Sequence, residues 1–209
     1  MKKILIFIDR DGTIIYDKKS YPGSQKNWKS KIKFLPKVIQ GLKLLNKIPN
    51  SEIRIITNQS GIAIKEISLL TRKRAEEVNK EIIRRLSKKK IYIGGSKICP
   101  HVNYKYVKEH PQFTFYKNFV GNYSCIKPSV GMIKSTLKEK KLKRKKVKIY
   151  VLGDRISDVK TASNIDGMGI LIPFANEPQP KNKIKKNVYV AKDFLDAANY
   201  ILCKEKIID

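Results

Sequence analysis

Short apolar runs alternate with longer segments of helical periodicity along this chain, and this alternation most constrains its fold. The apolar runs are rich in Ile and Val and predict buried strands at residues 4–8, 53–56, 147–152 and 168–172. Segments with helical spacing or helix-start residues lie at 36–48, 71–86, 128–140, 158–164 and 193–203. Strands that alternate with helices indicate βα units. We therefore expect an α/β fold with a three-layer, doubly wound and mainly parallel sheet.

The chain has 209 residues and shows neither an internal repeat nor a linker that would mark a second domain. Since domains usually contain about 100–200 residues, we expect a single domain over 1–209. Two stretches interrupt the alternation: residues 17–35 are polar, and residues 99–126 form a long segment rich in aromatic side chains. Long loops in compact domains are usually functional or held by additional contacts.

The composition is strongly basic, because 46 Lys plus Arg residues stand against 18 Asp plus Glu residues and give a formal net charge of +28. Clustered cations favour nucleic-acid binding, since they neutralise phosphates. However, 38 of these residues are lysine and 8 are arginine, and arginine is the residue that binds phosphates and bases with two parallel hydrogen bonds. Joint enrichment in Lys and Ile is also what an AT-rich genome produces. The charge alone therefore does not identify a partner.

Cys99, Cys125 and Cys203 are too few to form a disulfide framework in a chain of this length, which indicates a reducing compartment. The first apolar run stops at Asp9 and is too short for a signal peptide or a membrane span. We therefore expect a cytoplasmic protein without a membrane partner, as a monomer or a small homo-oligomer.

Two aspartates follow the first predicted strand, in the segment Asp9-Arg10-Asp11-Gly12-Thr13. In an extended chain Asp9 and Asp11 point to one side and Arg10 to the other. Open α/β sheets bind their ligands at the carboxyl ends of the strands. Such a pair of carboxylates can hold a divalent cation, attack phosphorus and transfer a proton. An acidic turn at a strand end has the same composition and is the alternative interpretation.

Three further segments carry groups that suit a phosphate ester. Thr57 and Asn58 end the second predicted strand and can form a phosphate-binding nest, although both are also common in turns. Lys127 precedes a predicted helix start and can neutralise a phosphoryl group. Asp154 follows another strand, in the position of a metal ligand, and Asp158 lies four residues further on, where it can share the same face or cap a helix.

In this order, the acid pair, Thr-Asn, Lys-Pro and Gly-Asp segments make residues 3–175 similar to the haloacid dehalogenase (HAD) superfamily of magnesium-dependent phosphohydrolases. The segments F-I-D-R-D-G-T, T-N-Q-S-G-I-A, C-P-H and C-I-K-P-S-V-G-M most resemble one branch. That branch contains the D-glycero-D-manno-heptose 1,7-bisphosphate phosphatases and the histidinol phosphatases, and it has little or no cap domain. Its members often have Arg directly before Lys-Pro, where this chain has Ile126.

The resemblance implies a role for each of these residues. Asp9 would be the nucleophile that forms an aspartyl-phosphate, and Asp11 would act first as general acid and then as general base. Thr57 and Asn58 would bind the transferred phosphate, and Lys127 would stabilise it.

The resemblance also implies a magnesium site. Mg²⁺ would be held by Asp9, by the main-chain carbonyl of Asp11 and by Asp154, with Asp158 in a supporting role. A cation shared by the nucleophile and the phosphate reduces the repulsion between the two anions.

The same branch carries a structural zinc ion in a loop with Cys-x-His followed by Cys-x-Cys. Cys99 and His101 match the first half, Cys125 matches the last cysteine, and Tyr123 stands at the position of the other cysteine. A structural zinc ion prefers four ligands. The resemblance therefore implies either a Cys2His2 site completed by His110 or a lost site.

Three functions remain compatible with these observations. The leading hypothesis is a magnesium-dependent phosphomonoesterase acting on a small phosphorylated metabolite, such as a sugar bisphosphate or histidinol phosphate. The alternative is a polynucleotide 3′-phosphatase, favoured by the charge of +28 and by the aromatic residues between 104 and 123, which suit base stacking. A non-catalytic binding protein is the third, and the presence of Asp9, Asp11, Lys127 and Asp154 argues against it.

Overall fold

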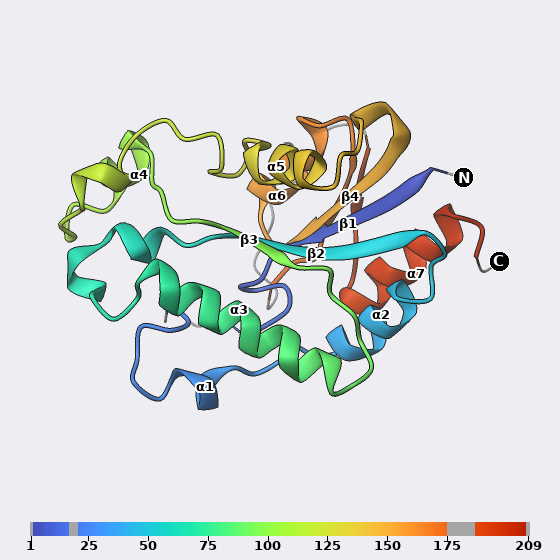
Figure 1. The fold of residues 1–209 in the computed structure, drawn as a ribbon, viewed down its shortest axis with the longest axis horizontal. Helices are drawn as coiled ribbons and strands as arrows, with labels where there is room; N and C mark the ends of the chain where they lie inside the picture. Colours follow the sequence, from blue (N-terminus) through green and yellow to red (C-terminus); the bar gives the residue numbers. More distant parts are fainter. Residues whose placement is uncertain (1, 17–20, 175–186, 208–209) are drawn as a thin grey trace.

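The computed structural model describes residues 2–16, 21–174 and 187–207 and is built around one six-stranded sheet (Figure 1). The strands are β1 (Lys3–Ile8), β2 (Ser51–Asn58), β3 (Ser96–Cys99), β4 (Val147–Gly153), β5 (Met168–Leu171) and β6 (Val188–Val190). Their order is β3-β2-β1-β4-β5-β6, and every neighbouring pair is parallel. The prediction of a doubly wound, parallel α/β sheet is confirmed.

Helices connect the strands. They are α1 (Trp28–Lys31), α2 (Val38–Leu45), α3 (Arg72–Ser87), α4 (Tyr104–Glu109), α5 (Gly131–Glu139), α6 (Ile156–Ser163) and α7 (Phe194–Lys204). Short 3-10 helices are η1 (Ser60–Ala63), η2 (Lys65–Ile67), η3 (Lys117–Phe119) and η4 (Arg144–Lys146). Among the described residues, none of these helices has the length and apolar character needed to span a membrane.

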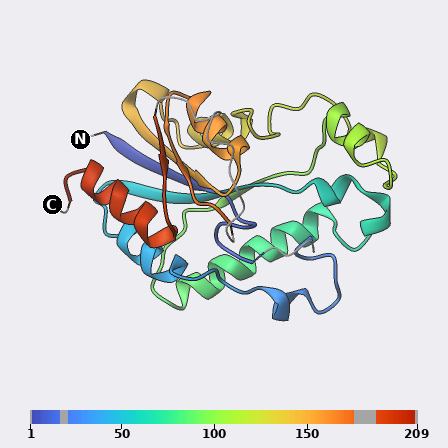
Figure 2. The same ribbon diagram turned by 180° about the vertical axis from the view of Figure 1, so that it is seen from behind.

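The helices cover both faces of the sheet, with α2, α3 and α7 on one face and α5 and α6 on the other (Figure 1 and, from behind, Figure 2). Because side chains alternate along a strand, β1 supplies both layers of the core. Ile4, Ile6 and Ile8 belong to the first core cluster, and Leu5 and Phe7 belong to the second. Burial on both faces explains why β1 is a continuous apolar run in the sequence.

All four predicted strands are present, and β3 and β6 are the two that the sequence did not predict. Both are outer strands, of four and three residues respectively, and are therefore too short to show a clear apolar pattern. The helix starts expected at residues 71 and 193 are confirmed, because Thr71 caps α3 by accepting from Arg74 N and Asp193 caps α7 by accepting from Leu195 N. The helix expected to open at Pro128 begins only at Gly131.

The aromatic segment 99–126 folds against the segment that follows β2. It contains α4 and η3 and lies beyond one end of the sheet, next to η1 and η2 (Figure 1). Lys65 N donates to Thr114 O at 2.9 Å, and Tyr116 N donates to Ala63 O at 2.9 Å. Backbone hydrogen bonds therefore hold this long segment at the carboxyl end of β2.

Gly41 lets α2 pack closely on α7. A Cβ atom at Gly41 would lie 2.6 Å from a ring carbon of Phe194 and 2.8 Å from the Phe194 backbone oxygen. Since a backbone atom cannot move aside cheaply, we expect Gly41→Ala to lower the free energy of unfolding by about 1–3 kcal/mol, as measured by chemical denaturation. Lys43→Ala, at an exposed position of the same helix, should change it by no more than about 0.5 kcal/mol. Equal stability of the two variants would contradict this packing.

Candidate active site

The strands β2, β1 and β4 are neighbours in the parallel sheet, and their carboxyl ends lie side by side at one edge of it. The strand order proceeds from β1 to β3 on one side and from β4 to β6 on the other, so the topological switch point lies between β1 and β4. Asp9 follows β1, and its backbone N–H donates to Leu152 O of β4 at 2.8 Å. Asp154 follows β4, and Asn58 ends β2. The topology therefore brings these residues to the place where open α/β sheets bind ligands.

Lys127 is a buried cation at this point. Its Nζ lies 2.5 Å from Asp9 Oδ1 and 2.5 Å from Asp158 Oδ1. Burial opposes the charged form, but the carboxylates of Asp158 and Asp9 outweigh it and raise the pKa of Lys127 above its ordinary value. The backbone N–H of Lys127 donates to Asn58 Oδ1 at 3.1 Å, which holds the loop before α5 against the end of β2.

Three buried carboxylates surround this cation, because one oxygen each of Asp9, Asp154 and Asp158 lie within 4.8 Å of one another. Burial raises the pKa of Asp9 to about 8, opposed by Lys127 and reinforced by Asp158 and Asp154. Burial and Asp158 raise the pKa of Asp154 to about 6. One ammonium does not balance three carboxylates, and carboxylate oxygens are the ligands that Mg²⁺ prefers. The group therefore fits a divalent cation.

The backbone makes room for these carboxylates. Gly12 has a φ of 81°, and a Cβ atom at this position would lie 2.5 Å from Asp154 Oδ2. Helix α6 begins at Ile156 with Arg155 as its N-cap, so Asp158 contributes to the cap from the third helical position, as part of a capping box. Its side chain accepts from the backbone N–H of Arg155 at 3.1 Å. Asp158 is therefore oriented both by the start of α6 and by Lys127.

The side chain of Asp11 lies outside this carboxylate group. Arg10 donates to both of its oxygens, from Nε to Oδ1 at 2.8 Å and from Nη2 to Oδ2 at 2.8 Å. Gln59 Nε2 donates to Oδ2 at 2.6 Å. The expectation that Arg10 points away from Asp11 is therefore wrong, because the chain leaves the extended conformation here. Arg10 and Gln59 are site residues that the sequence analysis missed.

Thr57 and Asn58 lie at the same site, with Thr57 next to Asp11 and Asn58 next to Lys127. Thr57 Oγ1 is 3.5 Å from Asp11 Oδ2 and accepts a hydrogen bond from Gln59 Nε2 at 2.8 Å. Asn58 contacts the backbone of Lys127. The structure thus brings the two residues together with the acid pair, the lysine and the Gly-Asp segment.

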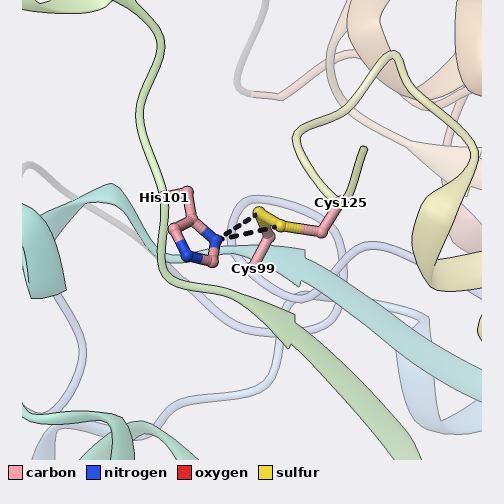
Figure 3. Close-up of side chains that lie close together, drawn as sticks. All are labelled: Cys99, His101 and Cys125. Carbon is pink, nitrogen blue, oxygen red and sulfur yellow. Dashed lines mark hydrogen bonds between the residues drawn. A yellow bond between two sulfur atoms is a disulfide. The ribbon is translucent and has the colours of Figure 1, made fainter. Parts of the chain in front are cut away.

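Cys99 and Cys125 form a disulfide bond, and His101 lies beside it (Figure 3). His101 Nδ1 is 3.3 Å from Cys125 Sγ and 3.9 Å from Cys99 Sγ. Tyr123 stacks on the His101 ring, with 3.6 Å between the ring centroids. The low cysteine count predicts no disulfide framework, and the structure nevertheless pairs two of the three cysteines. Because zinc ligation requires thiolates, the paired cysteines do not offer the predicted ligands.

His110 is not part of this cluster, which corrects the predicted Cys2His2 set. Its ring stacks on Tyr106 with 4.0 Å between centroids, and its Nδ1 lies 2.8 Å from Tyr106 O. Helix α4 lies between His101 and His110 and places the second histidine elsewhere. Within the described part of the chain, the cluster of His, Cys and acidic side chains at this place consists of Cys99, His101 and Cys125 alone.

Comparison with known proteins identifies the family. A family model described as polynucleotide kinase 3 phosphatase matches residues 3–194. The chain belongs to the polynucleotide kinase 3 phosphatase family. The match begins at β1 and reaches the start of α7. It therefore includes all the site residues, from Asp9 to Asp158.

Curated relatives of this polynucleotide kinase 3 phosphatase family member are histidine biosynthesis bifunctional proteins named HisB. The protein of Blochmanniella floridana is 31% identical over 170 residues, which is 81% of this chain and 41% of the relative. The protein of Buchnera aphidicola subsp. Schizaphis graminum is 27% identical over 170 residues. The chain thus spans about two fifths of the length of these relatives.

Solved structures share the fold of this family member. The D,D-heptose 1,7-bisphosphate phosphatase from B. bronchiseptica, complexed with magnesium and phosphate, has a TM-score of 0.70 at 19% identity, covering 98% of this chain and 99% of that chain. A protein from Mesorhizobium loti described as a HAD-like phosphatase has a TM-score of 0.73 at 19% identity, covering 100% and 88% of the two chains. This member of the polynucleotide kinase 3 phosphatase family therefore has the HAD-like fold.

The raised pKa of Asp154 predicts that magnesium binding depends on pH. Without a cation, Asp154 is protonated below a pH of about 6, and this proton must leave before its carboxylate can hold Mg²⁺. We therefore expect the affinity for Mg²⁺ to rise between pH 5 and pH 7, with a proton released on binding at the lower pH. Calorimetry in buffers of different ionisation enthalpy measures both quantities.

Two variants make this test specific. Asp154→Asn should weaken Mg²⁺ binding strongly, whereas Asp166→Asn, at an exposed aspartate, should leave it unchanged. An affinity that does not vary over this pH range, or equal binding by the two variants, would contradict the assignment of the site.

Proposed function

We propose that this chain is a phosphomonoesterase that hydrolyses a small phosphorylated metabolite, such as a sugar phosphate, a sugar bisphosphate or histidinol phosphate. The observation that carries the proposal is the buried ion pair between Asp9 and Lys127, next to Asp154 and Asp158 at the switch point of the sheet. Phosphoryl transfer requires mainly positioning and charge neutralisation, and this arrangement can supply both.

In the first step, a carboxylate oxygen of Asp9 attacks phosphorus. The bond between Asp9 and phosphorus forms while the bond between phosphorus and the ester oxygen breaks, and Asp11 gives its proton to the departing oxygen. Lys127 Nζ, 2.5 Å from Asp9 Oδ1, neutralises negative charge on the phosphoryl group. Thr57 and Asn58 orient that group by hydrogen bonds.

In the second step, water attacks the phosphorus of the aspartyl-phosphate. Asp11 takes a proton from this water, the bond between Asp9 and phosphorus breaks, and inorganic phosphate leaves. Mg²⁺ held by Asp9, Asp154 and the main-chain carbonyl of Asp11 would supply further positive charge beside the phosphate.

Several observations favour a metabolite as the substrate. The segments C-P-H and C-I-K-P resemble the heptose-bisphosphate and histidinol phosphatase branch. Relatives named HisB and a structural neighbour named D,D-heptose 1,7-bisphosphate phosphatase agree with that resemblance. The low arginine content also gives few bidentate phosphate contacts for a polynucleotide.

A polynucleotide 3′-phosphatase is the second candidate function. The description of the matching family model favours it, and so does the net charge of +28. Tyr104 and Tyr116, on the segment beyond the end of β2, are 60% and 40% exposed and could stack on unpaired bases.

The exchange Asp9→Asn tests the mechanism. The amide cannot form the aspartyl-phosphate, so we expect kcat to fall on the order of 10⁴-fold or more, as measured by phosphate release. Lys127 keeps its contact with Asp158, and we therefore expect the circular dichroism spectrum to stay native. Activity equal to that of the wild type would refute Asp9 as the nucleophile.

A second experiment distinguishes the substrates. Phosphate release is measured at equal Mg²⁺ and salt for heptose 1,7-bisphosphate, histidinol phosphate and a 3′-phosphorylated oligonucleotide. We expect a higher kcat/KM for one of the two metabolites. Turnover of the oligonucleotide alone would replace the proposed substrate class by the second candidate.

A further inference from the structure

We propose that Arg10 and Gln59 are positioning residues, which fix the carboxylate of Asp11 for proton transfer to the leaving group. The inference rests on the proposed function, because that function gives Asp11 its acid–base role. It assigns a task to a fully buried arginine that the mechanism above does not use.

Both carboxylate oxygens of Asp11 accept hydrogen bonds from neighbouring side chains. Arg10 binds Oδ1 and Oδ2 in parallel, each at 2.8 Å, and Gln59 binds Oδ2 at 2.6 Å. The two partners follow different strands, β1 and β2. A bidentate guanidinium contact fixes the plane of a carboxylate as well as its position, so Asp11 is held in one orientation although it follows the end of its strand.

Arg10 and Gln59 are themselves held by neighbouring elements. Arg10 Nη1 donates to Asn79 Oδ1 of α3 at 3.0 Å, and Arg10 Nη2 donates to Gln59 Oε1 at 2.7 Å. The backbone N–H of Gln59 donates to Cys99 O of β3 at 2.7 Å. The side chains of Arg10, Gln59 and Asn79 are all buried. A continuous set of hydrogen bonds thus connects α3 and β3 to the carboxylate of Asp11.

Gln59 also connects Asp11 to a residue that is proposed to bind the phosphate. Its Nε2 lies 2.8 Å from Thr57 Oγ1 and 2.6 Å from Asp11 Oδ2. One side-chain amide therefore sets the distance between the acid–base group and the phosphate-binding hydroxyl. Because a misplacement of about 1 Å can reduce a rate by about 10²-fold, this distance matters for proton transfer to the leaving oxygen.

A simpler role is that Asp11 and Gln59 only satisfy the buried charge of Arg10. The two roles predict different effects on different leaving groups. A displaced general acid slows the reaction of an alkyl phosphate, whose leaving oxygen needs a proton, much more than that of p-nitrophenyl phosphate, whose leaving group is stable as an anion. A loss of packing would slow both reactions equally.

The test uses Gln59→Met, which keeps the size of the side chain and leaves the contact between Arg10 and Asp11 possible. We expect kcat for an alkyl phosphate, glycerol 3-phosphate or the best metabolite found, to fall about 10- to 100-fold. The loss for p-nitrophenyl phosphate should be much smaller. In the Asp11→Asn background, Gln59→Met should cause little further loss, because the group that it positions is already absent.

The matched control is Thr136→Val, which removes a buried side-chain hydrogen bond within α5, to Met132 O, that involves neither Arg10 nor Gln59 nor Asp11. It should leave the ratio of the two rates close to that of the wild type. Three outcomes would each overturn the proposal. Gln59→Met could slow both substrates equally, the two variants could have the same rate ratio, or the loss in Gln59→Met could add fully to that in Asp11→Asn.

A crystal structure of Gln59→Met separates this inference from the proposed function. We expect the carboxylate of Asp11 to leave its present position while Lys127 remains paired with Asp9. An unchanged Asp11 carboxylate would overturn the positioning role. If the wild type hydrolyses no phosphate ester, the proposed function fails, and the position of Asp11 in this crystal structure still decides whether Gln59 holds it.

Discussion

Lys127 places a buried ammonium group 2.5 Å from the carboxylates of both Asp9 and Asp158. A buried charge without a partner costs several kcal/mol, so each of these side chains requires the others. They come from three separate parts of the chain: the end of β1, the loop before α5 and the first turn of α6. The ion pairs therefore join the segments around the switch point and at the same time place a cation beside the proposed nucleophile.

The charge balance of the site explains why a further cation fits it. Lys127 faces three carboxylates in a buried space, and the remaining negative charge would repel a phosphate ester. A divalent cation removes that repulsion. The carboxylate of Asp11 has a different environment, because Arg10 and Gln59 bind it. The two aspartates of one short segment thus have separate surroundings, as expected for two groups with separate tasks.

The sequence predicted the parts of the site that depend on long strands. Since β1 and β4 are buried apolar runs, their ends could be located, and the positions of Asp9 and Asp154 follow from them. The orientation of Asp11 could not be predicted, because the chain turns at Gly12 with a φ of 81° and side-chain alternation no longer applies. The position of His110 depends on α4, a helix of six residues within an aromatic segment without clear periodicity. β3 and β6 are likewise too short to be recognised.

The central claim is that Asp9 becomes covalently phosphorylated, and reductive trapping tests it most directly. Borohydride reduces an aspartyl-phosphate to homoserine, which peptide mass spectrometry locates in the chain. During turnover of a phosphate ester, we predict homoserine at position 9, and none when the ester is absent. Rapid turnover with Asp9 unmodified, or homoserine at another aspartate instead, would contradict the account.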